Sequence, residues 1–471
     1  MVDQKWLYEE ALATPGMHMT CSVPLDTDAA RQTGVPAFAF HLSPQSTTAS
    51  LWSADYKPNT GIPLTEAADT FPSSGRDGFI AWLVSRSSIS SQESVSHHEG
   101  SDAIWAKFIS CFSILRTLVY IEPIWRKFLS RMFHQLADDN VQWVDVRAAF
   151  SFDYFKEGND VPESSLDGFM QMVRVFGEEV EMFRATPAGK NFWGARLLWT
   201  TIRSFDNRTI AESESAPAMN PSTRTNHRQP PDMKHCIEVK LAFPALVSGF
   251  DLVGHEDPGR TLADLTPLLF WFRKRCAQAG VTLPFFFHAG ETLSTGGGAD
   301  LNLFDAITLG TRRLGHAFSL YKHPLLMNMV RDRRILVECC PISNEVLRYT
   351  HSIASHPVPA LIAQGVPVSL SNDDPAILGH DTAGMTHDFF QMLQALESLG
   401  LEGLGSLAEN SVRWAAFEDL GNKEWLESLK GGMYGNGVMA GRMKEWHKEW
   451  EVFCQWIVME FGADIDLDPE V

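Results

Sequence analysis

The sequence predicts an α/β fold in which parallel strands alternate with helices and close into a barrel, and two patterns support this. From residue 249 onward, short apolar runs alternate with stretches of helical periodicity. Each run ends in polar residues, as barrel strands do where their C-terminal ends meet. The clearest run is 284–291, in which four apolar residues precede His288, two small residues and Glu291. A short apolar run bounded by proline and a glycine-rich stretch is typical of a buried parallel strand.

Composition restricts the partners of the protein. The chain of 471 residues is long enough for one large barrel with insertions. Its 58 acidic and 39 basic residues give a net charge of −19, which argues against nucleic acid or an anionic membrane as the main partner but not against an uncharged nucleoside. The first ten residues lack the basic and apolar regions of a secretory signal, and no cysteine lies between residues 22 and 110. We therefore expect a cytoplasmic protein, with secretion as the alternative.

The elements follow in chain order. Residues 1–14 are expected to form a helix, and the stretch 16–22, which holds His18, the first barrel strand. Residues 25–100 are rich in Ser, Thr, Pro and Gly and are interpreted as an insertion after that strand, packed on the barrel within one domain covering 1–471. Residues 207–231 are polar, contain four prolines, and predict a flexible loop.

Eight strands with intervening helices are the number that a (β/α)8, or TIM, barrel requires. The predicted strands cover residues 16–22, 141–147, 191–203, 250–257, 284–291, 313–317, 335–341 and 366–375. The predicted helices cover residues 103–137, 165–183, 261–279, 301–309, 324–333 and 358–364. Residues 383–460 are helical in pattern and are expected to complete the outer layer as a C-terminal extension.

Polar residues at four strand ends carry the chemistry that the sequence suggests. They are His255 with Glu256, His288 with Glu291, His316, and Asp373 with Asp374. Each histidine alone is more often structural than catalytic. Imidazoles and a carboxylate from different strands nevertheless suit a zinc ion with an open coordination position, and zinc lowers the pKa of water towards 7. The combination favours a metal-dependent hydrolase, with Glu291 transferring a proton and His316 orienting hydroxide.

Three of these motifs, in this order, resemble the signatures of the adenosine deaminase family of the amidohydrolase superfamily. They are His288-Ala289-Gly290-Glu291, Gly315-His316 and Ser371-Asn372-Asp373-Asp374-Pro375. Two further stretches, 250–257 and 192–196, resemble the adenosine deaminase-related growth factor branch. The resemblance covers roughly residues 140–420.

The resemblance implies a deaminase that converts adenosine to inosine and ammonia. His288 and Asp373 would bind zinc, Glu291 would protonate purine N1, and His316 would aim the hydroxide at C6. The physical reason is that the C6 amine leaves poorly until the ring nitrogen is protonated and the carbon is tetrahedral.

For the substrate, the resemblance implies three contacts. Asp374 would hydrogen-bond purine N7, the backbone of Gly254 would meet N3, and His255 would lie near the sugar. The expected partner is thus a small purine nucleoside. Related proteins dimerise through N-terminal helices, so a monomer and a homodimer both stay open.

The first strand departs from the family pattern. The family carries two further zinc ligands there as His-x-His, whereas this chain has Pro15-Gly16-Met17-His18-Met19-Thr20-Cys21. His18 is either the second of the pair, with Gly16 in place of the first, or the first, with Thr20 in place of the second; the former is preferred. The expected ligand set is therefore His18, His288 and Asp373, a reduced site that binds zinc weakly or has lost it.

Two other functions stay open. One is deamination of AMP or of an N6-substituted adenine nucleotide, which would require a cationic phosphate pocket; Arg312 and Arg313 are more consistent with packing outside the mouth. The other is nucleoside binding or signalling without catalysis, which the reduced first-strand motif favours.

Overall fold

The structure is a computed structural model that describes residues 2–41, 49–211, 232–380, 382–396 and 398–462. Its centre is a series of parallel strands in two hydrogen-bonded groups, β4-β5-β6 and β7-β8-β9-β10. The groups join where Phe250 N donates to Pro284 O and Phe286 N donates to Phe250 O, at 2.9 and 3.0 Å. The strands are β4 (Trp143–Ala149), β5 (Gly194–Ile202), β6 (Val247–Val253), β7 (His288–Ala289), β8 (Arg313–His316), β9 (Leu336–Cys339) and β10 (Val368–Leu370).

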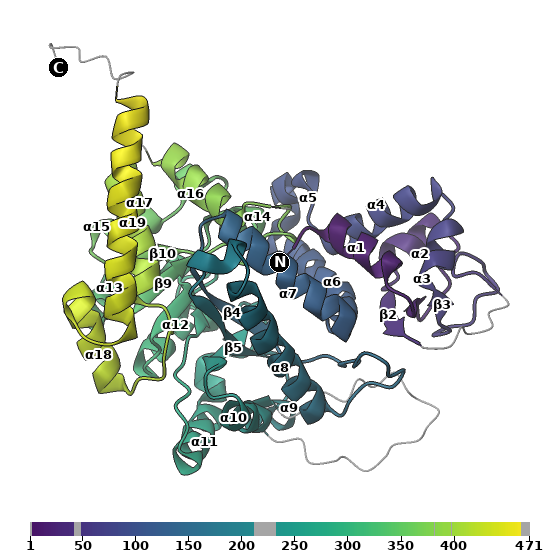
Figure 1. Cartoon of the computed structure of the whole chain (residues 1–471), viewed down its shortest axis with the longest axis horizontal. Coiled ribbons are helices and arrows are strands. Elements are labelled where there is room, and N and C mark those ends of the chain that lie inside the picture. Colours follow the sequence, from purple (N-terminus) through teal and green to yellow (C-terminus); the bar gives the residue numbers. More distant parts are fainter. Residues whose placement is uncertain (1, 42–48, 212–231, 381, 397, 463–471) are drawn as a thin grey trace.

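Helices link consecutive strands and cover the outside of the sheet (Figure 1). Helix α8 illustrates why they form, since Phe169, Met172, Phe176 and Val180 recur at helical spacing on its buried face, and Ser164 caps its N-terminus. The linking helices are α8 (Ser165–Arg184), α9 (Asn207–Ala211), α10 (Asp232–Ala242), α11 (Leu262–Ala279), α12 (Gly298–Thr308), α13 (Pro324–Asp332), α14 (Pro341–Val346) and α15 (Val358–Ala363). The predicted (β/α) barrel class is confirmed.

The predicted first barrel strand is wrong. Residues 17–20 form β1 (Met17–Thr20), which lies between β2 (Ala37–Phe40) and β3 (Ile62–Pro63) in a separate antiparallel sheet. His18 is opposite Ala39 on one side and Pro63 on the other, so both edges of β1 are occupied. A four-residue apolar strand can pair with any free edge, and its sequence does not say which one it finds.

The antiparallel sheet belongs to the N-terminal part of the chain, which includes the predicted insertion. Phe38 N donates to Thr117 Oγ1 at 3.0 Å, which ties β2 to α6. The helices here are α1 (Gln4–Ala13), α2 (Asp28–Thr33), α3 (Leu64–Asp69), α4 (Gly75–Ser87), α5 (Ser91–Val95), α6 (Gly100–Val119) and α7 (Glu122–Asp138). The described residues between 25 and 100 thus contain several helices and strands, and their interpretation as an insertion within one domain stays a prediction.

The strand series has two free ends, β4 and β10. In the part of the chain that the structure describes, neither strand pairs with the other. Every residue of β5 up to Thr201 is buried, whereas most of β4 is only half-buried. The parallel strands in the described residues therefore number seven, one fewer than predicted, and no strand pairing closes the series between β4 and β10.

The C-terminal residues are helical, as their pattern indicates. Helix α17 packs against β10 and α19, and α19 projects beyond the barrel (Figure 1). The helices are α16 (Gly384–Ala395), α17 (Gly400–Arg413), α18 (Asn422–Gly431) and α19 (Val438–Phe461). No helix in the described ranges has the length and apolar character needed to span a bilayer. Of the predicted loop 207–231, residues 212–231 lie outside the described residues.

Candidate active site

A cavity of about 1340 Å³ opens at the C-terminal ends of the parallel strands. It continues between β4 and β10 to apolar side chains of α16 and α17, such as Phe389 and Val412. Its wall contains all the predicted catalytic and substrate-binding residues and two of the predicted metal ligands. These are Gly254, His255, His288, Glu291, His316, Asp373 and Asp374. Parallel strand ends converge in this way because every strand points to the same rim.

His18 is the predicted site residue that the structure places elsewhere. It does not line the cavity, and its ring lies edge-on to His41 within the antiparallel sheet. Its Nδ1 is 2.9 Å from the carbonyl oxygen of Gly16. The predicted ligand set is therefore corrected: the structure brings His288 and Asp373 to one cavity and leaves His18 out, because β1 is not a barrel strand.

His288 is oriented by Asp251, a fully buried carboxylate on β6. The Nδ1–H of His288 donates to Asp251 Oδ2 over 2.6 Å, and the backbone N of His288 donates to Asp251 Oδ1 over 2.9 Å. This leaves Nε2 as the nitrogen that a metal could use, an arrangement common in metal sites. Asp251 was not predicted to act here, although a carboxylate inside an otherwise apolar strand was a usable signal.

Asp251 belongs to a chain of buried charges that crosses the barrel interior. Arg147 on β4 pairs with Asp251 at 2.8 Å and with Glu338 at 2.7 Å. Arg313 pairs with Glu338 at 2.5 Å and with Asp145 at 2.6 Å. Burial alone would raise the pKa of Asp251, but His288 and Arg147 lower it to about 2. Since every charge has a partner, the network holds His288 in place without an uncompensated buried ion.

Glu291 is a buried acid at the end of β7. Burial, followed by the carboxylates of Asp373 and Glu256, raises the pKa of Glu291 well above its usual value. Glu256 also holds the turn, since it accepts hydrogen bonds from the backbone N of Glu291 and Gly290 and from Asn302 at 2.9, 3.2 and 2.6 Å. Glu291 is thus a buried carboxyl group that keeps its proton to a higher pH than an ordinary glutamate does. Glu256 stood beside His255 in the sequence without an assigned role.

His316 lies beside Glu291 and Asp373. Its Nδ1 is 3.5 Å from Glu291 Oε1, and its Nε2 is 3.9 Å from Asp373 Oδ2. Burial lowers the pKa of His316 to about 4, against the opposing effect of Asp373, so the ring is neutral near pH 7. Its backbone has φ 59°, a left-handed conformation that a histidine adopts at a cost and that is concentrated at functional sites.

Asp373 and Asp374 follow β10 at the same rim. Ser343 Oγ donates to Asp373 Oδ2 at 2.7 Å, and Asp373 also has a positive φ, of 53°. Burial, and then the neighbouring Asp373, raise the pKa of Asp374 to about 8. A carboxyl group that keeps its proton near neutral pH can donate a hydrogen bond, which is a role open to Asp374.

The outer wall of the cavity contains an aromatic pair that the sequence did not indicate. His255 stacks on Trp105 with ring centroids 4.6 Å apart and an interplanar angle of 2°. Trp105 Nε1 donates to the hydroxyl of Tyr349 at 2.7 Å. Gly254 has φ 103°, which favours glycine at this bend after β6. Helix α6, outside the barrel strands, thus contributes to the predicted sugar side of the site.

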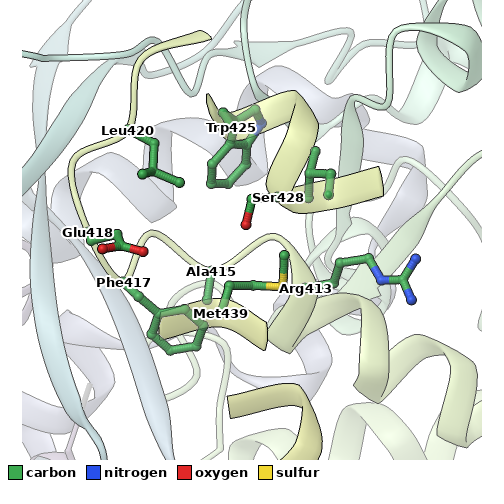
Figure 2. A pocket seen from close by; sticks show the side chains of 9 residues that line it. Arg413, Ala415, Phe417, Glu418, Leu420, Trp425, Ser428 and Met439 are labelled. Carbon is green, nitrogen blue, oxygen red and sulfur yellow. The ribbon is translucent and has the colours of Figure 1, made fainter. Parts of the chain in front are cut away.

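A second cavity is small, and Figure 2 shows it with the side chains that line it. It encloses about 10 Å³ between α17, α18 and α19 and is lined by residues such as Arg413, Trp425 and Met439. That volume admits at most one water molecule. None of the predicted site residues lines it.

Comparisons with known proteins show what this chain is similar to. The sequence model of the family described as adenosine deaminase matches residues 221–431. Adenosine deaminase 2 from Homo sapiens is 31% identical over 358 residues, covering 76% of this chain and 60% of that protein. Adenosine deaminase from Phlebotomus duboscqi is 27% identical over 428 residues, covering 90% of this chain and 70% of that protein. The solved structure of adenine deaminase from Arthrobacter aurescens covers 78% of this chain and 91% of its own, with 17% identity and a TM-score of 0.48.

The barrel and the motifs at its rim define an amidohydrolase-superfamily protein. The chain belongs to the adenosine deaminase family. It spans about 60% of the length of the human relative.

Proposed function

We propose that this chain catalyses hydrolytic deamination of adenosine or a related purine nucleoside to the inosine-type product and ammonia, with zinc as cofactor. The observation that carries the proposal is the pairing of Glu291 and His316. A buried carboxylic acid with a raised pKa lies 3.5 Å from a neutral imidazole, on the wall of a cavity that also holds His288 and Asp373. Such matched acid and base groups are what hydrolysis of an amidine requires.

The residues that would hold zinc are His288, through Nε2, and Asp373. Nε2 of His288, whose ring is oriented by Asp251 behind Nδ1, and the carboxylate of Asp373 are donors that zinc accepts. When bound, zinc would lower the pKa of water and supply hydroxide at neutral pH.

The remaining steps use the chain's own groups. Glu291 would donate its proton to purine N1, which makes C6 electrophilic and lets the ring nitrogen accept the electron pair as hydroxide adds. His316 would hold the hydroxide through its ring nitrogen and direct it at C6. The C6–N bond would then break, the amine would leave as ammonia with the proton of the added hydroxyl, passed through His316, and the C6 oxygen would become the carbonyl of the product. The neutral state of His316 suits it to accept a hydrogen bond from hydroxide or to receive its proton.

Recognition of the nucleoside would use the polar rim and the aromatic pair. Asp374, whose pKa of about 8 leaves it protonated at neutral pH, can donate a hydrogen bond to purine N7, which is an acceptor. The backbone N–H of Gly254 would meet N3. His255, flat against Trp105, would form the wall next to the sugar.

The test is an ultraviolet assay of adenosine conversion to inosine by the purified chain, with zinc measured on the same sample. We expect turnover that depends on zinc. Glu291→Gln should bind as much zinc as the parent and lose at least about a hundredfold in kcat, since it cannot donate a proton. Glu427→Gln, on the exposed surface of α18, is the matched control. Asp373→Ala should lose both zinc and turnover. Full activity of Glu291→Gln would contradict the assigned proton donor.

A second function is favoured by one observation, the place of His18 outside the cavity. Of the three predicted metal ligands, two remain at the rim, so the chain can alternatively bind a nucleoside without converting it. Binding of inosine or adenosine measured by calorimetry, with no zinc and no turnover after zinc is supplied, would support this function over the first.

A further inference from the structure

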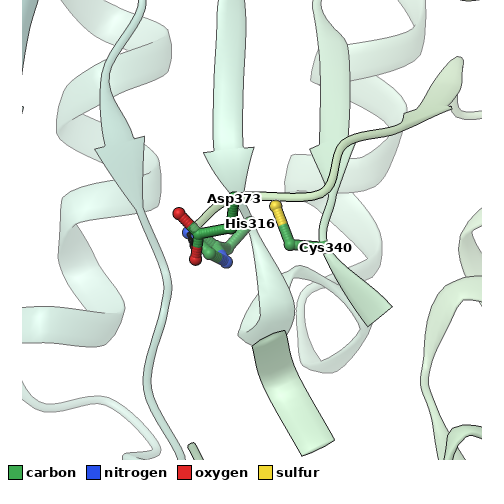
Figure 3. Close-up of side chains that lie close together, drawn as sticks. All are labelled: His316, Cys340 and Asp373. Carbon is green, nitrogen blue, oxygen red and sulfur yellow. Dashed lines mark ion pairs between the residues drawn. The ribbon is translucent and has the colours of Figure 1, made fainter. Parts of the chain in front are cut away.

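Cys340 is the feature of the cavity that the proposed chemistry does not use. It follows β9 directly, lines the cavity and is 5% exposed. One donor atom each from His316, Cys340 and Asp373 lie within 4.8 Å of one another (Figure 3). In the described ranges, these three side chains come together closely enough to hold a metal ion.

The neighbours of this cluster leave the thiol of Cys340 available to a cation, while Ser343 donates to Asp373 and Asn344 lies 3.2 Å from His316 Nδ1. Cys340 Sγ has only a weak contact, 3.8 Å, with the backbone oxygen of Glu338. Glu291 Oε1, which is buried, has no hydrogen-bond partner in the described residues and is aimed at His316 from 3.5 Å. A sulfur, a nitrogen and a carboxylate oxygen from three strand ends form a donor set that zinc and cobalt accept, and that magnesium and calcium do not prefer.

We propose that this cluster is a metal-binding site in which Cys340 supplies a thiolate ligand together with His316 and Asp373. On binding, the S–H bond of Cys340 breaks, the sulfur coordinates the divalent ion, and the proton passes to the buffer. The metal keeps its oxidation state. Water can complete the coordination sphere.

The proposed metal site lies in the same cavity as the proposed deaminase active site, but the proposal does not depend on deaminase activity. It engages His316, so it excludes the hydroxide-holding role of that histidine while the metal is bound. The two proposals therefore describe alternative coordination modes, and a spectroscopic readout separates them from one another.

The adjacent Cys339 provides a matched control. It is equally buried, but its Sγ lies 3.9 Å from His356 Nε2 instead of in the cluster. Cys339→Ser and Cys340→Ser thus remove the same atom type at neighbouring positions, and only one of them belongs to the proposed site.

The experiment is a titration of the metal-free full chain with Co²⁺, followed by the ultraviolet thiolate-to-cobalt charge-transfer band. We expect the band in the parent and in Cys339→Ser, and its loss in Cys340→Ser, with cobalt affinity lowered at least about tenfold. Circular dichroism would establish that each variant is folded. Absence of the band in the parent, or its persistence in Cys340→Ser, would overturn the proposal.

A second variant keeps the test decisive if Cys340→Ser does not fold. Asp373→Asn removes the carboxylate and leaves the thiol in place, so the band should appear only at cobalt concentrations at least about tenfold higher. A band formed with the affinity of the parent would overturn the proposed donor set. Deamination without the thiolate band would contradict the proposed metal site but not the proposed function. The band without deamination would support the metal site and contradict the proposed function.

Discussion

The Nδ1–H of His288 donates to Oδ2 of Asp251 across 2.6 Å, while the backbone of the same histidine donates to the other oxygen of that carboxylate. The pair fixes both the ring and the end of β7. Arg147 binds Asp251 from β4, so three strands meet at one carboxylate. The orientation of the proposed metal ligand is therefore set by a residue that touches neither metal nor substrate.

Asp251→Asn should lower zinc affinity by about 10- to 100-fold. The amide is uncharged and has one acceptor oxygen, so it cannot accept both hydrogen bonds that orient the imidazole of His288. Competition with a chelator would measure this affinity. Asp300→Asn is the control, since Asp300 is a buried partner of His323 outside this charge network. Equal losses of zinc in both variants would mean that the effect is general destabilisation.

Glu256→Gln should lower kcat by about a hundredfold and leave zinc binding intact. Its two carboxylate oxygens accept from Gly290, Glu291 and Asn302, and an amide nitrogen at one of these positions would repel a donor. Displacement of the proton donor by about 1 Å has a cost of that size. Steady-state kinetics with zinc analysis would check the prediction, and a rise in KM with unchanged kcat would count against a positioning role.

Trp105→Leu should raise KM for adenosine several-fold with a smaller effect on kcat. The substitution removes the stacked support of His255 and the hydrogen bond to Tyr349, both at the rim and away from Glu291. The exposed Trp456 on α19 offers a control, Trp456→Leu, outside the cavity. A change in kcat with no change in KM would contradict a role of Trp105 in substrate binding.

Asp232 makes stability depend on pH. Burial raises the pKa of Asp232 to about 7, although Thr201 and Trp199 donate hydrogen bonds to it. The folded state therefore keeps a proton that the unfolded chain releases near pH 4, so the free energy of unfolding falls as pH rises from about 4 to 7. Asp232→Asn should flatten this fall, and Asp332→Asn, on an exposed side chain, should not. Urea unfolding at several pH values would measure both, and an unchanged slope in Asp232→Asn would contradict the prediction.

Much of the barrel was predictable, because strand ends and helices leave local signals. The apolar run before His288 and the alternation after residue 249 identified the strands from β6 onward. The motifs at their ends correctly indicated a shared rim for His288, Glu291, His316 and the Asp373–Asp374 pair. In parallel strands, a polar residue after an apolar run can lie only at one edge.

The residues around this rim could not be assigned in the same way. Asp251, Glu256 and Arg147 act through partners more than 30 residues away, and Trp105 reaches the site from a helix far earlier in the chain. Such contacts depend on how elements pack, which no local pattern encodes. Cytoplasmic location and homodimerisation stay predictions.

The sequence by itself determined the family, the barrel class and the acid and imidazole groups of the proposed chemistry, since these reside in short motifs fixed by strand geometry. Only the tertiary structure decided where His18 and Cys340 lie relative to the cavity. Both lie in short apolar strands or at their ends, but β1 pairs with β2 and β3 while β9 pairs within the barrel. A short strand pairs with whichever strand edge the tertiary structure leaves free. For this reason His18 lies outside the cavity and Cys340 lies in its wall.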